Sequence, residues 1–426
     1  MTIKKTLLIV LLLGCVFLII TYLKLSADSI TQETCTVKVI ADVDKVDFKK
    51  FKNIKVSAST VYEGDLFKEL LQGSNYRTSW EAEIEAPILY LDTLYGGVEI
   101  VKEGGGKQTQ SLRLETDNDL LLTLRSINKN PEALVPEYLK NLGLENIVMD
   151  GISGQHPYAA LVVAKLSDYI NLNHTQPKVV FLPKQKLLDQ KYNDEYGNRL
   201  YLLEYENKGK YNWTAHHNVT ELIDTEDLQE LKVSLKDSLS IDKSILIRAR
   251  LFDIVIGDWD RHAKQWGWII QKKDSLLYNA IPLPVDRDNA FFNVDGFINS
   301  LVTNKNITPH LQSFQPEIDN MEGLVYDFDV YFLQKTTLQQ FLEQAQYIQT
   351  QLTDEKIKAA FKLWNKTLYD LEAENIIAKI KARRDRLIDT AKRFKSVLDN
   401  KPKLIKLLKG TDIDDVSNAS IQCFEC

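Results

Sequence analysis

The chain begins with an uncharged apolar run from Thr6 to Leu23, which Lys4 and Lys5 precede. Its 18 residues are enough to cross a bilayer as a helix, for which about 17–25 residues suffice. A cleaved signal peptide normally has a shorter apolar region of about 7–15 residues. The pattern therefore predicts a retained anchor in residues 1–27 that is held in the membrane through residues 6–23.

The charges around this run predict its orientation. Lysines precede it and the acids Asp28 and Glu33 follow it, so the positive-inside rule keeps the short N-terminus in the cytoplasm and places the body outside. The residues Leu12 to Cys15 also have the form of a lipoprotein processing box, and lipidation of Cys15 is therefore an alternative. The apolar stretch continues past Cys15, which such a lipoprotein would not need.

Strand-like runs follow the anchor. Residues 28–75 are polar, with alternating patches at 36–40 and 54–57 that predict a short β-rich lead-in or stalk. Four further runs predict an antiparallel meander with Gly104, Gly105 and Gly106 at one of its turns. These runs are 86–91, 98–102, 108–115 and 120–126.

The middle of the chain changes from strand to helix periodicity. Helical spacing predicts helices at 135–142 and 146–171, and two further short strands are expected at 178–182 and 200–204. The polar, Gly-containing segment 207–211 is typical of a connector between two lobes.

From Thr220 onward the pattern is largely helical, with a strand-rich insert at 267–292 and amphipathic helices in 336–398. The order of elements predicts an α+β chain with a β-rich lobe at 76–206 and a mostly helical lobe at 207–400. Residues 401–426 are expected to form a tail.

Composition and charge narrow the classes of protein. Of the 426 residues, 44% are apolar and 26% charged, which is typical of a globular protein. The formal charge of −6 gives no global electrostatic footprint for nucleic acid, so we expect no nucleic-acid partner. The basic stretch 379–409 is either a solvated helical face or a contact with an anionic membrane surface.

The four cysteines lie near the chain ends, so they predict neither a disulfide framework nor a zinc cluster in the body. Cys423 and Cys426 have the spacing of a redox or metal pair. A disulfide involving some of these two and Cys35 is one interpretation, and a tail without a role is the other.

The residues that carry chemistry lie in Arg250–Trp268 and Ile281–Phe292. An apolar helical run ends at Gly257, a polar loop with Asp258 and Asp260 follows, and a later strand ends in two more acids, Asp286 and Asp288. Phosphoryl transfer needs one carboxylate to accept the proton of an attacking hydroxyl and another to hold the metal that bridges the phosphates. The pattern of helix, acidic loop, hairpin and acidic turn provides both.

The loop W-D-R-H-A-K-Q resembles the catalytic loop of atypical kinases, namely the secretory-pathway kinases and, more distantly, the type II phosphoinositide kinases. The resemblance implies a two-lobed protein-kinase-like fold that uses ATP and Mg²⁺ or Mn²⁺. In ordinary protein kinases a metal-binding Asn lies five residues after the catalytic Asp. Gln265 has this spacing from Asp260, which favours Asp260 over Asp258 as the base.

The segment P-V-D-R-D-N-A-F-F resembles the metal-binding Asp motif of kinases, in which the Asp lies five residues before a Phe. Asp286 and Phe291 keep that spacing. Asp286 is therefore the first choice for the metal ligand and Asp288 the second, with Gln265 completing the set.

The resemblance also assigns parts of the first lobe. Gly104, Gly105 and Gly106 would form the loop over the phosphates, since glycine lets backbone N–H groups approach oxygen. Arg125 stands near the position of the kinase lysine, and Lys129 follows four residues later. No helix offers a clear partner acid for these cations, because only Glu145 and Asp150 lie nearby.

A closer resemblance covers most of the body. The motifs N-Y-R-T-S-W (75–80), H-P-Y-A-A-L-V (156–162) and I-G-D-W-D-R-H are similar to those of a group of largely uncharacterised bacterial envelope proteins. This resemblance implies the bacterial periplasm or cell envelope as the location. The acceptor would be an unidentified envelope protein, lipid or glycan.

The same residues suggest two functions other than phosphoryl transfer. A catalytically inactive, pseudokinase-like binding or scaffold module is favoured by Arg125 and by the missing helix acid. A metallophosphoesterase reading of G-D-W-D-R-H fails, because the spacing of its acids is one residue short and no Asp-x-His lies upstream.

Overall fold

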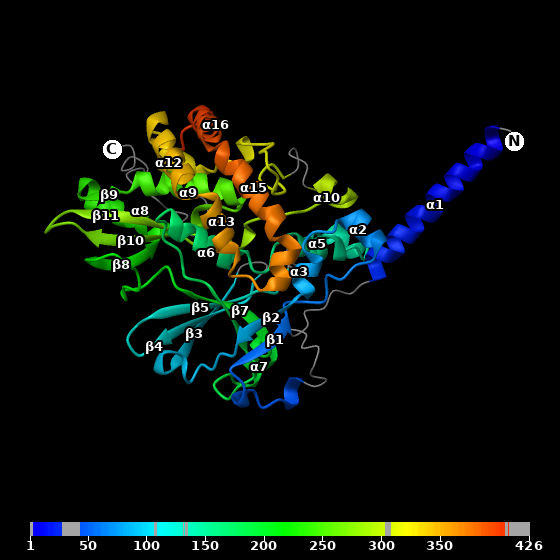
Figure 1. The fold of residues 1–426 in the computed structure, drawn as a ribbon, viewed down its shortest axis with the longest axis horizontal. Helices are drawn as coiled ribbons and strands as arrows, with labels where there is room; N and C mark the ends of the chain where they lie inside the picture. The colour runs from blue at the N-terminus through cyan, green and yellow to red at the C-terminus, as the bar shows by residue number, and fades with distance from the viewer. Residues whose placement is uncertain are drawn as a thin grey trace.

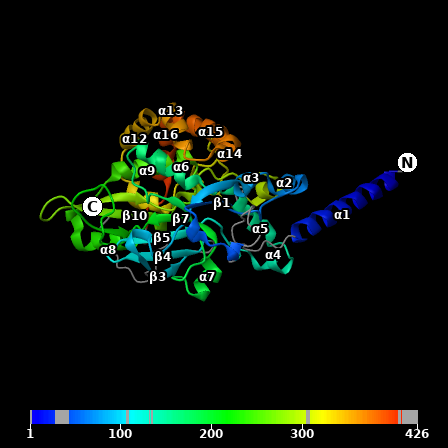
Figure 2. The ribbon, with the colours of Figure 1, turned by 60° about the horizontal axis from the view of Figure 1, so that its bottom comes forward.

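The computed structural model describes residues 3–27, 43–105, 109–130, 132, 135–302, 308–404 and 408. The body is a mixed α+β structure in which the first half of the chain supplies most of a sheet-rich region and the second half most of a helical region (Figures 1 and 2). The predicted α+β class with this order of elements is confirmed. Gly106, Cys35, Cys423, Cys426 and the patch at 36–40 lie outside the described residues.

The sheet-rich region is built around five antiparallel strands in the order β3-β4-β5-β7-β6. Side chains of β4 and β5 alternate between buried and half-buried, and their leucines form a core on one face of the sheet. The strands are β3 (Val98–Gly104), β4 (Ser111–Thr116), β5 (Leu121–Ser126), β6 (Lys178–Leu182) and β7 (Arg199–Tyr205). The predicted meander from residue 98 to 126 and both later strands are confirmed.

The run at 86–91 is not part of that meander, contrary to the sequence-based expectation. Its first residues belong to β2 (Glu83–Pro87), which pairs with β1 (Asn53–Ser57) in a separate two-stranded sheet. Val56 of β1 and Trp80 are buried in the core that extends into the helical region. The segment predicted as a lead-in therefore contains a strand that packs onto the body.

Short helices surround these strands. The helix predicted across 146–171 is two helices, which are separated by a 3₁₀ turn at Gly151–Gly154 and by Gln155 in an extended conformation. The helices are α2 (Leu66–Gln72), α3 (Arg77–Glu81), α4 (Glu137–Asn141), α5 (Asn146–Asp150), α6 (Ala159–Tyr169) and α7 (Gln190–Tyr196).

A second sheet has the strand order β8-β10-β11-β9. The residues from Thr220 were expected to be helical, but β8 (Val219–Asp224) is a strand that pairs with β10 (Trp266–Lys272). β10 forms a hairpin with β11 (Tyr278–Pro284), as the strand-rich insert predicts, and β9 (Leu239–Ile241) lies parallel to β11. α8 (Thr225–Leu235) follows β8.

The helical region is organised around α9 (Lys243–Ile256), which is buried over most of its length and packs against α12, α15 and α16. The amphipathic helices predicted within 336–398 are confirmed. The remaining helices are α10 (Phe297–Val302), α11 (Asp327–Leu333), α12 (Leu338–Gln351), α13 (Asp354–Phe361), α14 (Lys366–Leu368), α15 (Glu374–Asp385) and α16 (Leu387–Asn400).

The N-terminal helix α1 (Ile3–Ala27) projects away from the body (Figure 1). Its segment Lys5–Leu23 has a mean hydropathy of 2.8, and none of it is buried. By length and composition, this helix can span a membrane.

Candidate functional site

Helix α9 delivers the first acidic loop. Asp242 caps the start of the helix by accepting the Ile245 N–H, and Gly257 ends it in a left-handed conformation with φ 69°. A Cβ at position 257 would lie 2.4 Å from the Phe314 ring, so only glycine fits this turn. The chain therefore leaves the helix sharply into the loop that carries Asp258 and Asp260.

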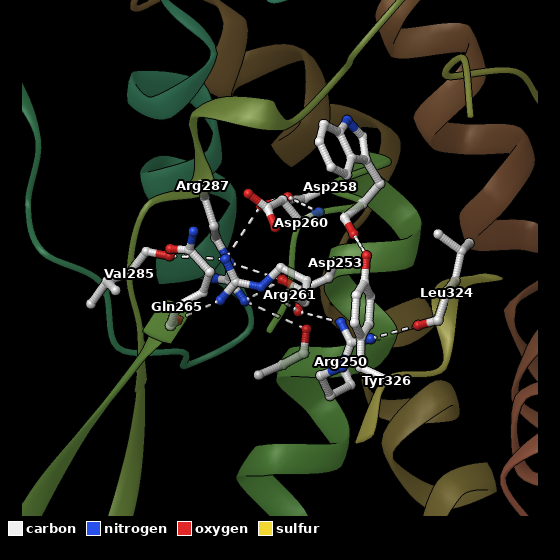
Figure 3. Close-up of polar contacts among 12 residues, drawn as sticks. Arg250, Asp253, Asp258, Asp260, Arg261, Gln265, Val285, Arg287, Leu324 and Tyr326 are labelled. Atoms are coloured by element: carbon white, nitrogen blue, oxygen red, sulfur yellow. Dashed lines mark hydrogen bonds and ion pairs between the residues drawn. The ribbon is translucent and has the colours of Figure 1, made fainter. Parts of the chain in front are cut away.

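A buried ion network lies beneath this loop (Figure 3). Asp253 contacts three guanidinium groups, with N–O distances of 2.9 Å to Arg250, 3.2 Å to Arg261 and 2.8 Å to Arg287. Burial alone would raise the pKa of Asp253, but the three arginines together lower it. Arg250 also binds Asp329 of α11 at 2.6 Å, which connects α9 to the next helix.

Arg261 connects the first acidic segment to the second. Its guanidinium donates to the backbone oxygen of Val285 at 2.8 Å and to that of Gln265 at 2.9 Å. Val285 directly precedes Asp286, and its N–H binds the Gln265 oxygen at 3.1 Å. The two acidic segments are therefore held at a fixed relative position.

The two aspartates of the first loop have different surroundings. Asp258 is only 3% exposed and accepts the Asp260 N–H at 3.2 Å. Burial raises the pKa of Asp258 well above its usual range, and the nearby Asp253 charge adds to this, although Arg261 opposes it. The Asp260 side chain is 26% exposed, and its carboxylate lies 3.5 Å from His262 Nε2. Asp260 is the aspartate of this pair that a substrate can reach, whereas Asp258 braces the loop.

Two basic residues that follow or belong to strand β5 of the sheet-rich region lie against the acidic turn of Asp286 and Asp288. The Arg125 guanidinium lies 3.2 Å from the Glu204 carboxylate and 3.0 Å from that of Asp286. The Lys129 ammonium lies 2.7 Å from the Asp288 carboxylate. The structure thus brings together four residues that the sequence assigned separately to cofactor and metal binding.

The surroundings of this turn shift the pKa values of its two carboxyl groups in opposite directions. Burial alone would raise the pKa of Asp286, but the positive charges of Arg125 and Lys129 outweigh it and the pKa is lowered. Burial and the Asp286 charge raise the pKa of Asp288 to about 6, in spite of Lys129. Asp286 is therefore an anion at neutral pH. Its backbone has a φ of 56°, which is unusual for a residue other than glycine.

Glu204 is the functional neighbour that the sequence analysis did not assign. It projects from β7 on the same face as Arg125, because residue 125 is paired with residue 202 and residue 123 with residue 204. The partner acid of Arg125 thus comes from the neighbouring strand and not from a helix. Asp150 is instead bound by Arg77, at 2.6 Å. In the sequence, the one feature that pointed to Glu204 was that it is the single acid in the apolar strand run at 200–204.

The glycine turn after β3 is described as far as Gly105. Gly105 has φ 128°, and a Cβ there would lie 2.0 Å from the Thr109 oxygen, so this position requires glycine. Gly104 ends the strand. The backbone geometry therefore explains the glycine at position 105.

The donor set of the acidic turn fits a hard divalent cation. Mg²⁺ takes oxygen ligands and is usually bound by one or two carboxylates together with phosphates and water. Asp286 and Asp288 supply two carboxylates, and Gln265, which is 7% exposed, lies at the start of the hairpin. In the described part of the chain, no group of three His, Cys, Asp or Glu residues could hold a metal. A cation here would need ligands from a bound phosphate.

No protein-family model and no curated protein matches this chain. Among solved structures it is similar to the Helicobacter pylori proinflammatory kinase CtkA, with a TM-score of 0.39 and 16% identity over 71% of this chain and 96% of that chain. It is also similar to a chain in the Shewanella oneidensis MR-1 complex of HipA, HipB and operator DNA, a toxin–antitoxin system. That match has a TM-score of 0.34 and 9% identity over 70% of this chain and 67% of the other. Both TM-scores are low, so the function must be argued from the site itself.

Proposed function

We propose that the chain is a membrane-anchored, kinase-like phosphotransferase whose body lies outside the cytoplasm, in a bacterial periplasm or cell envelope. It transfers a phosphoryl group from ATP, with Mg²⁺ or Mn²⁺, to a hydroxyl group of an envelope protein, lipid or glycan. The observation that carries the proposal is the meeting of Arg125 and Lys129 with Asp286 and Asp288, next to a loop that presents Asp260.

Each residue has a role that its surroundings support. Arg125 and Lys129 are cations positioned to bind phosphate oxygens, and an arginine can do so with two donors at once. Asp286, Asp288 and Gln265 would hold the metal, which when bound neutralises charge on the phosphates. Asp260 accepts the proton of the attacking hydroxyl, as a partly exposed carboxylate in a braced loop can do.

A specific contact favours the second candidate function, an inactive pseudokinase-like binding or scaffold module. Arg125 pairs directly with Asp286, so the carboxylate proposed to hold the metal already has a positive partner. A divalent cation must compete with that guanidinium, and arginine is not equivalent to the lysine of kinases. In a binding module, the ion pair between Arg125 and Asp286 would stay formed and no metal would displace it.

Replacing Asp286 by Asn tests the proposal, because it removes the charge that holds the metal. The variant should lose metal-dependent nucleotide binding, measured by titrating the full chain in detergent with ATP, with and without Mg²⁺ or Mn²⁺. Its unfolding temperature without ligand should stay nearly unchanged, since Arg125 keeps Glu204 as a partner.

Asp288→Asn is the matched control and should weaken binding less. Its carboxylate lies against Lys129 and has a raised pKa, so it contributes a weaker charge. Binding of Mg-ATP by Asp286→Asn at the level of the parent would contradict the assignment.

A further inference from the structure

We propose that the folded body is itself partly embedded in the membrane, through an apolar patch beside the C-terminal end of α1. The patch consists of Leu66 and Leu70 of α2, Tyr138 and Leu142 at α4, and Phe297 of α10. Its ligand is the hydrocarbon and interfacial layer of the bilayer. The inference rests on the proposed anchor and adds a second membrane contact to it.

The patch stands out by its exposure. Five large apolar side chains of the described body outside α1 are more than 60% exposed, and four of them belong to the patch. These four are Leu66 (86%), Leu70 (66%), Tyr138 (65%) and Phe297 (65%), whereas the fifth is Leu276 (73%) in the distant β10–β11 turn. Exposed apolar surface gathered in one place marks an interaction site.

The patch residues come from separate parts of the chain but lie together. Helix α2 packs against α10, and α1 packs against α5, which follows α4. Figure 1 places α2 and α5 next to the base of α1, with α10 beyond α2, and Figure 2 places α4 beside that base. The helices that carry the patch therefore gather at the body end of the helix that can span the membrane.

The contacts between α1 and the body indicate how deep the patch would lie in the bilayer. The Phe17 ring contacts the Phe67 ring of α2, with centroids 6.1 Å apart. Phe17 lies six residues before the end of the apolar segment at Leu23, which is about 9 Å at 1.5 Å per residue. If α1 spans a hydrocarbon core of about 30 Å, then Phe67 lies within it, at the depth of about 5–10 Å that interfacial helices reach.

A second contact lies at the level of the membrane surface. The Tyr22 hydroxyl donates to the backbone oxygen of Leu142 at 3.0 Å. Tyr22 is one residue from the end of the apolar segment, where tyrosines are enriched because their rings are amphipathic. Both α2 and the end of α4 are thus tied to α1 at positions near or within the bilayer boundary.

The one lysine of α2 does not oppose this placement. The Lys68 ammonium lies 3.4 Å from the buried Asp150 carboxylate and donates to the Glu63 oxygen at 3.0 Å. Its charge is directed to the body, while Leu66 and Leu70 on the same helix are exposed. Leu66 and Leu70 therefore form an exposed apolar pair on α2, next to the half-buried Glu69.

Photo-crosslinking of the full chain tests this contact. The photoreactive residue benzoylphenylalanine is introduced separately at position 70 in the patch, at 12 in α1 and at 276 in the β10–β11 turn. Each variant is reconstituted in vesicles of radiolabelled phosphatidylcholine and must unfold at the same temperature as the parent. Leu276 is the matched control, because it is an equally exposed leucine far from α1.

We expect strong lipid labelling at positions 12 and 70 and several-fold weaker labelling at 276. Labelling at 12 with no more label at 70 than at 276 would overturn the embedded patch and leave the anchor in place. Absence of label at 12 would overturn both. Crosslinking of position 70 to a second copy of the chain instead of lipid would identify a self-association surface and also overturn the proposal.

Discussion

The charged residues around the two acidic segments form two groups. The groups differ in burial, and therefore in whether they can exchange their partners for a ligand. Around Asp253, the three arginine partners are almost fully buried, and breaking such a buried pair typically costs about 3–5 kcal/mol. The side chains of Asp286 and Asp288 are 21% and 16% exposed, so they can exchange partners with a ligand. The first group supports the loop, and the second is available for binding.

Glu372, which belongs to neither group, allows the dependence of stability on pH to be tested. Burial raises the pKa of Glu372 to about 7, although a hydrogen bond from Ser79 opposes this. A carboxyl group whose folded pKa is raised stabilises the protein when it is protonated. Its contribution is full below the ordinary value of 4.5 and is lost as the pH rises through about 7.

Glu372→Gln should remove this dependence, since glutamine stays neutral. We expect the variant to unfold a few degrees above the parent at about pH 8 and at nearly the same temperature as the parent at about pH 4. Thermal unfolding of the full chain at the two pH values measures the difference. An equal difference between variant and parent at both values would show that Glu372 does not titrate in this range.

At the scale of elements, the end of α9 positions the loop that carries Asp258 and Asp260. Gly257→Ala must adopt φ 69° and place a Cβ 2.4 Å from the fully buried Phe314 ring. The left-handed conformation alone costs about 1–2 kcal/mol, and displacement of the ring adds to it. We expect the free energy of unfolding to fall by more than about 2 kcal/mol.

Gly143→Ala is the matched control, because Gly143 has a similar φ of 64° with no atom within 4 Å of the added Cβ. Its cost should be about 1–2 kcal/mol, from backbone strain alone. Chemical denaturation of both variants gives the comparison. Equal losses would mean that the contact with Phe314 does not constrain the turn.

Local periodicity predicted many elements of this fold but not all of its pairings. The strands β4, β5, β6 and β7 and the helices after residue 336 have clear alternating or helical patterns, and they were predicted. The pairing of β1 with β2 joins segments about 30 residues apart and has no local signal. Likewise, Glu204 becomes the partner of Arg125 only once β5 and β7 are neighbours.

In the candidate site too, features with a local sequence pattern were predicted and long-range contacts were not. The spacing around Asp260 and Asp286 pointed to an acidic loop and an acidic turn, and the structure places Arg125 and Lys129 against that turn. The network of Arg250, Asp253 and Arg287 was not predicted, because charges within an apolar helix or turn do not reveal their partners. Long-range ion pairs follow from the packing of α9 against the hairpin and not from spacing.

At the scale of the whole molecule, the proposed orientation follows from charges at one end of α1. Lys4 and Lys5 should keep the N-terminus in the cytoplasm and the body outside. A reporter that is active only outside the cytoplasm should therefore be active when fused after residue 426. A reporter that works only in the cytoplasm should be inactive there, and activity of that reporter alone would contradict the topology.

Phosphate transfer itself tests the central claim most directly. The full chain is incubated with γ-labelled ATP, Mg²⁺ or Mn²⁺ and envelope extract, and label in the acceptor is compared for the parent, Asp260→Ala and Asp258→Ala. We expect Asp260→Ala to keep nucleotide affinity within a few fold and to lose about 10²–10⁴-fold in transfer, the usual share of general-base catalysis. Asp258→Ala should have a smaller effect that follows its loss of stability, because Asp258 braces the loop. Equal transfer by the parent and Asp260→Ala would reject Asp260 as the base, and no transfer by a parent that binds nucleotide would favour the binding module.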